Sequence, residues 1–206
     1  MKILITGGAG YIGSATYYLM LKKKIQPIIV DKLIYKKKNI IPNKSIFYKT
    51  NISNINLIKK IIKKHNITSV IHFAAYKDVE ESISNPLKYK INNYLLTKKF
   101  IKCCKESGIK YFIFSSTAAV YGNLKKNKKV LENFPLMPLS MYGVTKKKIE
   151  EYLKKISDDN FKFFSLRYFN VYGKRMLLEG AYCLVLGIFA KQMLDGKPMT
   201  INNDGK

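Results

Sequence analysis

Arginine is nearly absent from this chain, although its charge is strongly positive. Only Arg167 and Arg175 are arginine among 38 basic residues, which outnumber 13 acidic ones and give a formal net charge of +25 at pH 7. Proteins that read bases or phosphates commonly use the planar fork of arginine. We therefore interpret the lysines as a compositional bias spread over tolerant surfaces, and we expect any nucleic-acid binding to be weak and independent of base sequence.

Cysteine, histidine and long apolar runs are scarce as well. The cysteines are Cys103, Cys104 and Cys183, and the histidines are His65 and His72. No C-x-x-C pair occurs, and no metal site of ordinary ligand spacing can be built, so we expect no bound metal. The longest apolar stretch is too short to span a bilayer, and the first residues enter a strand with no room for a signal peptide. These features predict a cytoplasmic protein.

Short apolar runs alternate with longer amphipathic segments over most of the 206 residues, and 47% of residues are hydrophobic. This alternation is typical of an α/β fold with a doubly wound parallel sheet. Strands are predicted near residues 2–6, 27–31, 45–50, 69–74, 111–115 and 162–167. Helices are predicted near residues 11–23, 54–65, 86–107 and 142–157.

The pattern changes from about Arg175 onward. One more helix is predicted near residues 182–195 and a short strand at Met199–Ile201. The last residues, Asn202-Asn203-Asp204-Gly205-Lys206, are a turn signal. We expect a first domain over residues 1–174 and only the start of a second domain over residues 175–206.

A glycine-rich motif follows the first predicted strand. Residues 6–13 read TGGAGYIG, directly after Ile3-Leu4-Ile5 and before a helical pattern. In a strand–turn–helix unit of this kind, Gly7 permits the tight turn, Gly10 lets the backbone approach a pyrophosphate, and Gly13 lets helix and strand pack closely. The helix N-terminus then offers amide donors to phosphates, so the motif predicts dinucleotide binding.

An acidic residue at the end of the second predicted strand indicates which dinucleotide. Asp31 lies about 20 residues beyond the glycine motif, where a carboxylate can accept both hydroxyls of an adenosine ribose and repel the 2′-phosphate of NADP. NAD is therefore favoured. Lys32 keeps NADP as an alternative, because a cation there could accommodate the 2′-phosphate.

Hydroxyl and phenol groups follow later strands. Ser115, Ser116 and Thr117 lie at the predicted carboxyl end of the fifth strand, and Tyr142 and Lys146 are four residues apart on a predicted helix, so both project from one face. An ammonium beside a phenol stabilises the phenolate and lowers the pKa of the phenol, so Tyr142 could serve as a general base toward a sugar hydroxyl. Surface contacts and strand-end capping are the alternatives to this interpretation.

Taken together, the motifs resemble the extended short-chain dehydrogenase/reductase family of NAD-dependent epimerases and dehydratases, and within it the UDP-glucose 4-epimerase group. The resemblance rests on TGGAGYIG at 6–13, Asp31, Asn51-Ile52, HFAAYK at 72–77, Asn92, SST at 115–117, YGVTK at 142–146 and RYFNVYG at 167–173. It covers essentially the whole chain, in the family's order, and implies a Rossmann-type fold.

The resemblance also implies roles for individual residues. It assigns NAD binding to Gly7, Gly10, Tyr11, Ile12, Gly13, Asp31, Asn51, Ile52, Phe73, Ala74, Ala75, Lys77, Asn92, Ser115, Tyr142, Lys146 and Phe169. It assigns substrate binding to Lys77, Thr117, Tyr142 and Asn170. The implied catalytic residues are Thr117, Tyr142 and Lys146. The region over residues 175–206 would be the incomplete start of a nucleotide-sugar-binding domain.

The implied reaction is epimerisation at C4 of a UDP-hexose through a 4-keto intermediate, where the UDP-hexose is UDP-glucose, UDP-galactose or an N-acetylated analogue. Ala118 and Ala119 follow Thr117, where related 4,6-dehydratases and decarboxylases typically carry an acidic residue, so an epimerase or a simple keto-reductase is favoured over a dehydratase. A non-catalytic NAD-binding fragment is a further alternative. The resemblance also implies a homodimer, formed through the helices near 86–107 and 142–157.

Overall fold

A computed structural model describes residues 2–34, 45–123, 129–174, 176 and 185–201. The chain forms two compact units, Met1–Phe169 and Asn170–Lys206. The first unit contains the sheet and most helices, and the second contains α7 (Val185–Leu194). Within the described residues, we find no helix with the length and apolar character that a membrane span requires.

A six-stranded parallel sheet forms the centre of the first unit, in the order β3-β2-β1-β4-β5-β6. The strands are β1 (Ile3–Thr6), β2 (Ile28–Asp31), β3 (Phe47–Lys49), β4 (Ser69–His72), β5 (Tyr111–Thr117) and β6 (Lys162–Tyr168). The chain runs outward from β1 through β2 to β3 and then returns to β4 on the other side of β1. This reversal makes the doubly wound Rossmann-type order and leaves a crevice beyond the carboxyl ends of β1 and β4.

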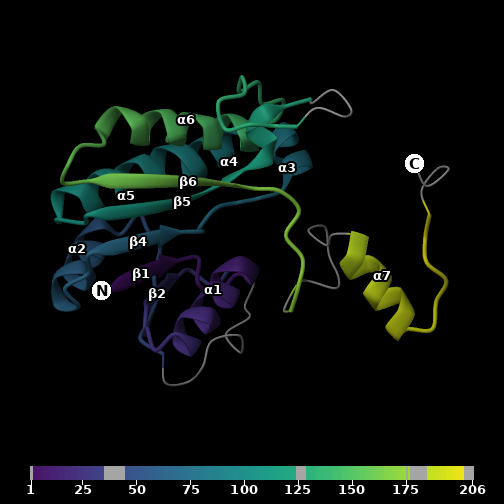
Figure 1. Cartoon of the computed structure of the whole chain (residues 1–206), viewed down its shortest axis with the longest axis horizontal. Helices are drawn as coiled ribbons and strands as arrows, with labels where there is room; N and C mark the ends of the chain where they lie inside the picture. The colour runs from purple at the N-terminus through teal and green to yellow at the C-terminus, as the bar shows by residue number, and fades with distance from the viewer. Residues whose placement is uncertain (1, 35–44, 124–128, 175, 177–184, 202–206) are drawn as a thin grey trace. The chain divides into compact units, whose positions relative to one another are not determined.

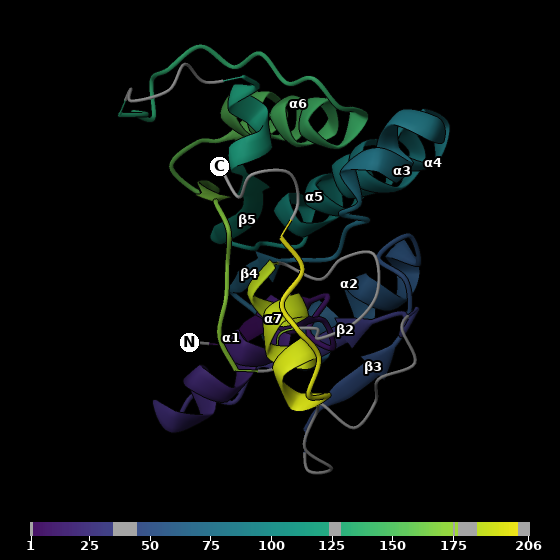
Figure 2. The ribbon, with the colours of Figure 1, turned by 90° about the vertical axis from the view of Figure 1, so that its right-hand side faces the viewer.

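Helices cover the two faces of this sheet (Figures 1 and 2). Those of the first unit are α1 (Tyr11–Lys22), α2 (Ile55–Lys64), α3 (Val79–Ser84), α4 (Pro86–Tyr89), the π-helix η2 (Lys90–Leu96), α5 (Thr97–Glu106), the 3₁₀-helix η3 (Ala118–Tyr121) and α6 (Met141–Ile156). The larger core cluster joins the sheet to α2, α5 and α6, and the smaller joins it to α1. Strands covered on both faces read as continuous apolar runs, as β1 and β2 do.

The helix predicted over residues 86–107 is continuous but divided into α4, η2 and α5. Asn85 caps its start by accepting a hydrogen bond from the N–H of Lys88, and Pro86 occupies the first turn. The π-helical turn of η2 brings the buried Asn93 against the chain after β4, where its side chain bonds both the N–H and the C=O of Tyr76. Such π-helical insertions have no periodicity that a sequence reveals.

The strand predicted at Met199–Ile201 is wrong, since these residues are irregular. The N–H of Thr200 donates instead to the side chain of Gln192 on α7, at 3.1 Å. A strand must pair its backbone groups with a second strand, and the described residues of the second unit contain none. The helix predicted near 182–195 is observed as α7, and residues 182–184 lie outside the described part.

A histidine is buried between the sheet and α5. His72 accepts or donates a hydrogen bond at Nδ1 with Thr6 Oγ1 (2.6 Å), and its ring stacks at 6.1 Å on Phe114. Burial, with a smaller contribution from the charge of Lys146, lowers the pKa of His72 to about 3. The ring is therefore neutral in the folded protein at physiological pH.

This histidine is expected to make folding pH-dependent. The folded-state pKa of about 3 lies below the unfolded value of 6.5, so the unfolded state binds more protons between these values. The free energy of unfolding should fall as pH drops below about 6.5, by at most about 1.4 kcal/mol per pH unit from this group. Urea unfolding at several pH values should show a flatter dependence for His72→Gln than for the unchanged chain. Equal slopes would contradict the assignment.

Candidate functional site

The glycine-rich turn lies at the carboxyl end of β1, against the segment that follows β4. Gly7 has a φ of +72°, and a Cβ built on it would lie 2.6 Å from the backbone nitrogen of Ala74. A Cβ on Gly13 would lie 2.3 Å from the carbonyl oxygen of Gly7. The backbone of the turn therefore packs against the segment after β4, and the start of α1 packs against the turn. Both contacts agree with the roles expected of these two glycines.

The N-terminus of α1 is open to an anion. Helix α1 begins at Tyr11 after Gly10, and no side chain caps this end. No acidic residue occupies its first turn. The first amide groups of a helix lack partners within the helix and carry partial positive charge, so they suit a phosphate.

Asp31 lies beside this turn, at the end of β2. Its Oδ2 accepts a hydrogen bond from the N–H of Ala9 (3.0 Å), and its Oδ1 accepts one from the N–H of Leu33 (2.7 Å). These two backbone donors fix the carboxylate at the edge of the crevice. Leu33 adopts a φ of +56°, a left-handed conformation that the bond to Asp31 helps to hold.

The neighbouring lysine is engaged on the other side of the crevice. Lys32 Nζ donates to Tyr76 Oη (3.1 Å) and to Asn92 Oδ1 (3.4 Å), and it lies 4.6 Å from the centroid of the Tyr76 ring. The ammonium is thereby held by residues that follow β4 and by η2. The sequence alone could not give this arrangement, because it joins three separate elements.

The other residues expected at the cofactor lie at the same edge of the sheet, after β3 and β4. Asn51 Oδ1 accepts from the N–H of Ser53 (3.0 Å), while the side chain of Ile52 is buried in the larger core cluster. Phe73 and Ala74 are partly buried against the two core clusters. Ala75 is also partly buried, and Lys77 is exposed.

The three expected catalytic residues come together where β5 meets α6. Thr117 is the last residue of β5, and a side-chain hydrogen bond joins it to Tyr142 on α6. One turn later, Lys146 is buried, and its Nζ donates to the carbonyl oxygen of Ser115 (2.6 Å). The same ammonium lies 5.8 Å from the centroid of the Tyr142 ring and 4.8 Å from that of Phe114.

The titration properties of this group differ from the expectation for Tyr142. Burial lowers the pKa of Lys146 to about 7, although the charge of Glu150 partly opposes this. Burial raises the pKa of Tyr142, and the hydrogen bond from Thr117 offsets only part of that effect. The lowered pKa expected for Tyr142 is therefore wrong for this arrangement, because desolvation of the phenolate outweighs the hydrogen bond from Thr117.

A buried ion pair behind the end of β5 was not expected from the sequence. Glu150, on α6, accepts hydrogen bonds from Ser116 Oγ and from the guanidinium of Arg167, whose Nη2 lies 2.7 Å from Glu150 Oε2. Arg167 also donates to Tyr121 Oη at 2.9 Å. The available signal was the position of Glu150, four residues after Lys146 and therefore on the same helical face.

Two predicted residues lie at or beyond the boundary of the first unit. Phe169, the last residue of that unit, is largely exposed, and its ring lies 6.4 Å from that of Tyr121. Asn170 opens the second unit, so its place beside the substrate stays a prediction. Among the described residues, no group of three or more His, Cys, Asp or Glu side chains could hold a metal ion.

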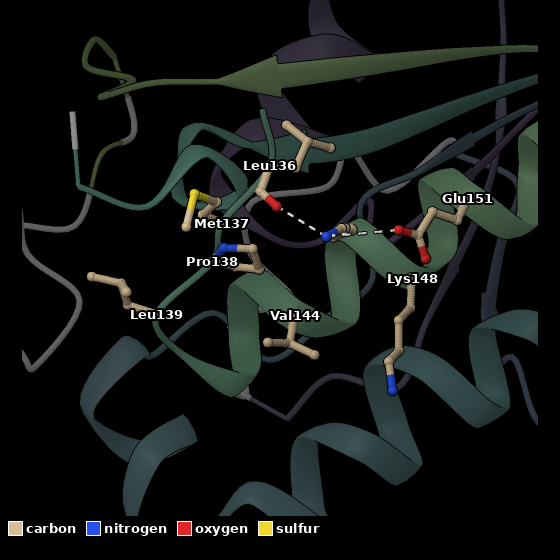
Figure 3. Close-up of a pocket in the computed structure, with 8 residues that line it drawn as sticks. Leu136, Met137, Pro138, Leu139, Val144, Lys148 and Glu151 are labelled. Atoms are coloured by element: carbon tan, nitrogen blue, oxygen red, sulfur yellow. Dashed lines mark hydrogen bonds and ion pairs between the residues drawn. The ribbon is translucent and has the colours of Figure 1, made fainter. Parts of the chain in front are cut away.

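An open pocket lies on the other side of α6 and contains none of the predicted site residues (Figure 3). Its volume is about 460 Å³, and its lining is Leu136, Met137, Pro138, Leu139, Val144, Lys147, Lys148 and Glu151. Lys147 Nζ fixes one wall by donating to the carbonyl oxygen of Leu136 (2.9 Å). The groups suited to chemistry lie at the carboxyl ends of β1, β2 and β5, and none of them lines this pocket.

The sequence of this chain is similar to those of known proteins. Residues 3–206 match the NAD dependent epimerase/dehydratase family. The chain is 37% identical over 174 residues to a UDP-glucose 4-epimerase of Lactobacillus helveticus, in an alignment that covers 84% of this chain and 52% of that protein. It thus spans about half the length of the curated relatives it matches.

Solved structures give the same result. The UDP-glucose 4-epimerase of Thermus thermophilus, in complex with NAD, superposes with a TM-score of 0.89 at 31% identity, over 98% of this chain and 65% of that one. The UDP-N-acetylglucosamine 4-epimerase of Methanobrevibacter ruminantium gives a TM-score of 0.87 at 32% identity, over 99% and 66%. The expected fold and family are confirmed, and this chain belongs to the NAD dependent epimerase/dehydratase family.

Proposed function

We propose that the crevice beyond β1 and β4 binds NAD. The glycine turn and the uncapped start of α1 would hold the pyrophosphate through Gly10, Tyr11 and Ile12. The fixed carboxylate of Asp31 would accept the hydroxyls of the adenosine ribose, which favours NAD over NADP. The engagement of Lys32 with Tyr76 and Asn92 supports this choice, because its ammonium is committed to other partners.

We further propose that the chain carries the catalytic centre of a UDP-hexose 4-epimerase. The observation that carries this proposal is the meeting of Thr117, Tyr142 and Lys146 at the end of β5. Tyr142 would take the proton of the sugar 4-hydroxyl, and Thr117 would join hydroxyl and phenol by hydrogen bonds. Lys146, which is anchored on the carbonyl oxygen of Ser115, would hold the nicotinamide ribose. The chemistry that bound NAD would supply is reversible hydride transfer at C4 of the sugar.

The residues after Thr117 favour epimerisation over dehydration. Ala118 and Ala119 begin η3 and place no carboxylate next to Thr117, whereas elimination of water requires an additional acid or base. The relatives act on both plain and N-acetylated sugars according to their names. Our proposal therefore extends to the class of UDP-hexoses and UDP-N-acetylhexosamines.

The test combines cofactor release with turnover. The purified chain would be denatured and its supernatant analysed for NAD, while native protein is assayed for conversion of UDP-galactose to UDP-glucose and of the N-acetylated pair. Released NAD with turnover supports the proposal. NAD without turnover would identify an NAD-binding fragment or another nucleotide-sugar enzyme, and failure to bind NAD even after soaking would refute the assignment of the glycine turn.

We also propose a homodimer, formed through an aliphatic stripe made of Ile83, Leu87, Ile91 and Leu95. These residues recur every four positions along α3, α4 and η2, and they are 64%, 62%, 44% and 41% exposed. A group of exposed apolar side chains of this kind is typical of a protein interface. The segment lies within or next to the helix for which the family resemblance implies pairing.

The double variant Leu87→Glu/Ile91→Glu is expected to be monomeric, because two carboxylates would be desolvated in the interface. Sedimentation velocity at micromolar concentration would show half the mass of the unchanged chain. Leu19→Glu, at an equally exposed leucine on α1, is the matched control and should leave the dimer intact. A monomeric unchanged chain would refute the proposal.

We propose a cytoplasmic location for the protein. Cys103 and Cys104 are adjacent, buried, free thiols, and burial raises the pKa of both. Thiols kept reduced and protonated in the core fit a reducing compartment.

A further inference from the structure

Three consecutive residues at the end of β5 each contact a different turn of α6. The backbone carbonyl of Ser115 accepts from Lys146, the hydroxyl of Ser116 donates to Glu150, and the side chain of Thr117 bonds to Tyr142. Tyr142, Lys146 and Glu150 follow one another at intervals of four, so they share one face of the helix. The position of α6 along β5 is thus fixed at three points, of which only two belong to the expected catalytic group.

The third point is anchored from a second strand. Arg167 on β6 donates from Nε to both carboxylate oxygens of Glu150 at 3.2 Å, and from Nη2 to Oε2 at 2.7 Å. Nη1 of the same guanidinium donates to Tyr121 Oη on η3 and to the carbonyl oxygen of Glu132 (2.7 Å). Only arginine offers enough donors in one plane to serve all these acceptors.

The carboxylate of Glu150 also lies one helical turn from the buried ammonium of Lys146. Lys146 is 3% exposed and Glu150 is 8% exposed, so water screens their interaction little. Burial holds the pKa of Lys146 near 7, and the charge of Glu150 counteracts a further fall. The other titratable groups facing Lys146 are Tyr142 on its own helix and His72 on β4, which is neutral at this pH.

We propose that Glu150 is a positioning residue for Tyr142 and Lys146: held by Ser116 and Arg167, it fixes the register of α6 against β5 and balances the buried ammonium of Lys146. This inference rests on the proposed roles of Tyr142 and Lys146, and it adds a residue that touches neither cofactor nor sugar. Its action is transmitted through Lys146. Arg167 weakens the effect of Glu150 on Lys146, because the guanidinium neutralises part of the carboxylate charge.

The experiment measures the protonation of Lys146 directly, without cofactor or substrate. The chain would be labelled with ¹⁵N- and ¹³C-lysine, and the Lys146 signal would be identified by its disappearance in Lys146→Met. Its midpoint of titration would then be followed by NMR. Because the measurement requires neither NAD binding nor turnover, its result is independent of whether the proposed reaction holds.

Two variants should move this midpoint in opposite directions. Glu150→Gln keeps the shape but removes the charge, and it should lower the midpoint by roughly one pH unit. Arg167→Gln leaves the carboxylate uncompensated, and it should raise the midpoint. Glu150→Asp retains the charge, so its Lys146 midpoint should lie closer to that of the unchanged chain than the midpoint in Glu150→Gln does.

Glu151→Gln is the matched control. Glu151 is the next residue of α6, is 60% exposed on its side chain, and pairs with Lys147 at 3.9 Å, so its replacement should leave the midpoint unchanged. A folded Glu150→Gln chain with an unchanged midpoint would overturn the proposal, as would an equal shift in Glu151→Gln. Should Glu150→Gln fail to fold, the direction of the shift in Arg167→Gln decides, since a purely structural role predicts no rise.

Discussion

Replacing Tyr142 with phenylalanine is expected to lower the rate of epimerisation by about 10²- to 10⁴-fold, the usual contribution of a positioned general acid or base. The ring would keep its place on α6, and only the group that exchanges a proton with the sugar hydroxyl would be lost. NAD binding should persist, because Lys146 would still donate to Ser115 and the glycine turn is untouched. Steady-state rates and NAD titration on the same preparation would separate the two effects.

Tyr152→Phe provides the matched control for this variant. Tyr152 lies ten residues further along α6, where the ammonium of Lys98 lies 5.1 Å from its ring centroid. Its replacement should change neither rate nor cofactor affinity. Equal losses in both variants would indicate damage to the helix, and full activity in Tyr142→Phe would exclude the phenol as the catalytic group.

Gly7→Ala should have the second large effect, on stability and on NAD binding together. The new Cβ would carry the cost of a positive φ and would meet the backbone of Phe73 and Ala74 at 2.6–2.9 Å. We expect the free energy of unfolding to fall by about 2–4 kcal/mol, from strain and overpacking combined. Urea unfolding and calorimetric titration with NAD would measure the two losses.

Gly108→Ala separates the two causes. Gly108 has a similar φ of +79°, but a Cβ there would meet nothing within 4 Å. This variant should lose only about 1 kcal/mol, from backbone strain, and should bind NAD normally. If both variants lost the same stability, the close approach of the turn to β4 would contribute nothing.

Much of the fold follows from local signals in the sequence. All six strands of the sheet were expected near their observed positions, because parallel strands read as apolar runs between amphipathic helices. The short helices α3 and η3 were not predicted, because six and four residues are too few to show the helical periodicity of apolar side chains. The false strand at Met199–Ile201 arose for the opposite reason: its apolar residues favour a strand, but a strand also needs a pairing partner.

The candidate site was predictable where a motif places its residues on one element. Tyr142 and Lys146 are one helical turn apart, and the glycines lie within eight residues, so spacing alone brings them together. The pair of Glu150 and Arg167 joins α6 to β6 across 17 residues, and the contact of Lys32 with Tyr76 joins positions 44 residues apart. Such contacts depend on tertiary packing, which sequence periodicity does not report.

The partly buried guanidinium of Arg167 also contrasts with the composition of the chain. In this chain, lysine makes up all but two of the 38 basic residues. Lysine has one point of charge and three donors, so it cannot replace the fork that joins Glu150, Tyr121 and Glu132 at once. Arg167 thus marks a place where the chemistry of the fold opposes the bias that shaped the rest of the sequence.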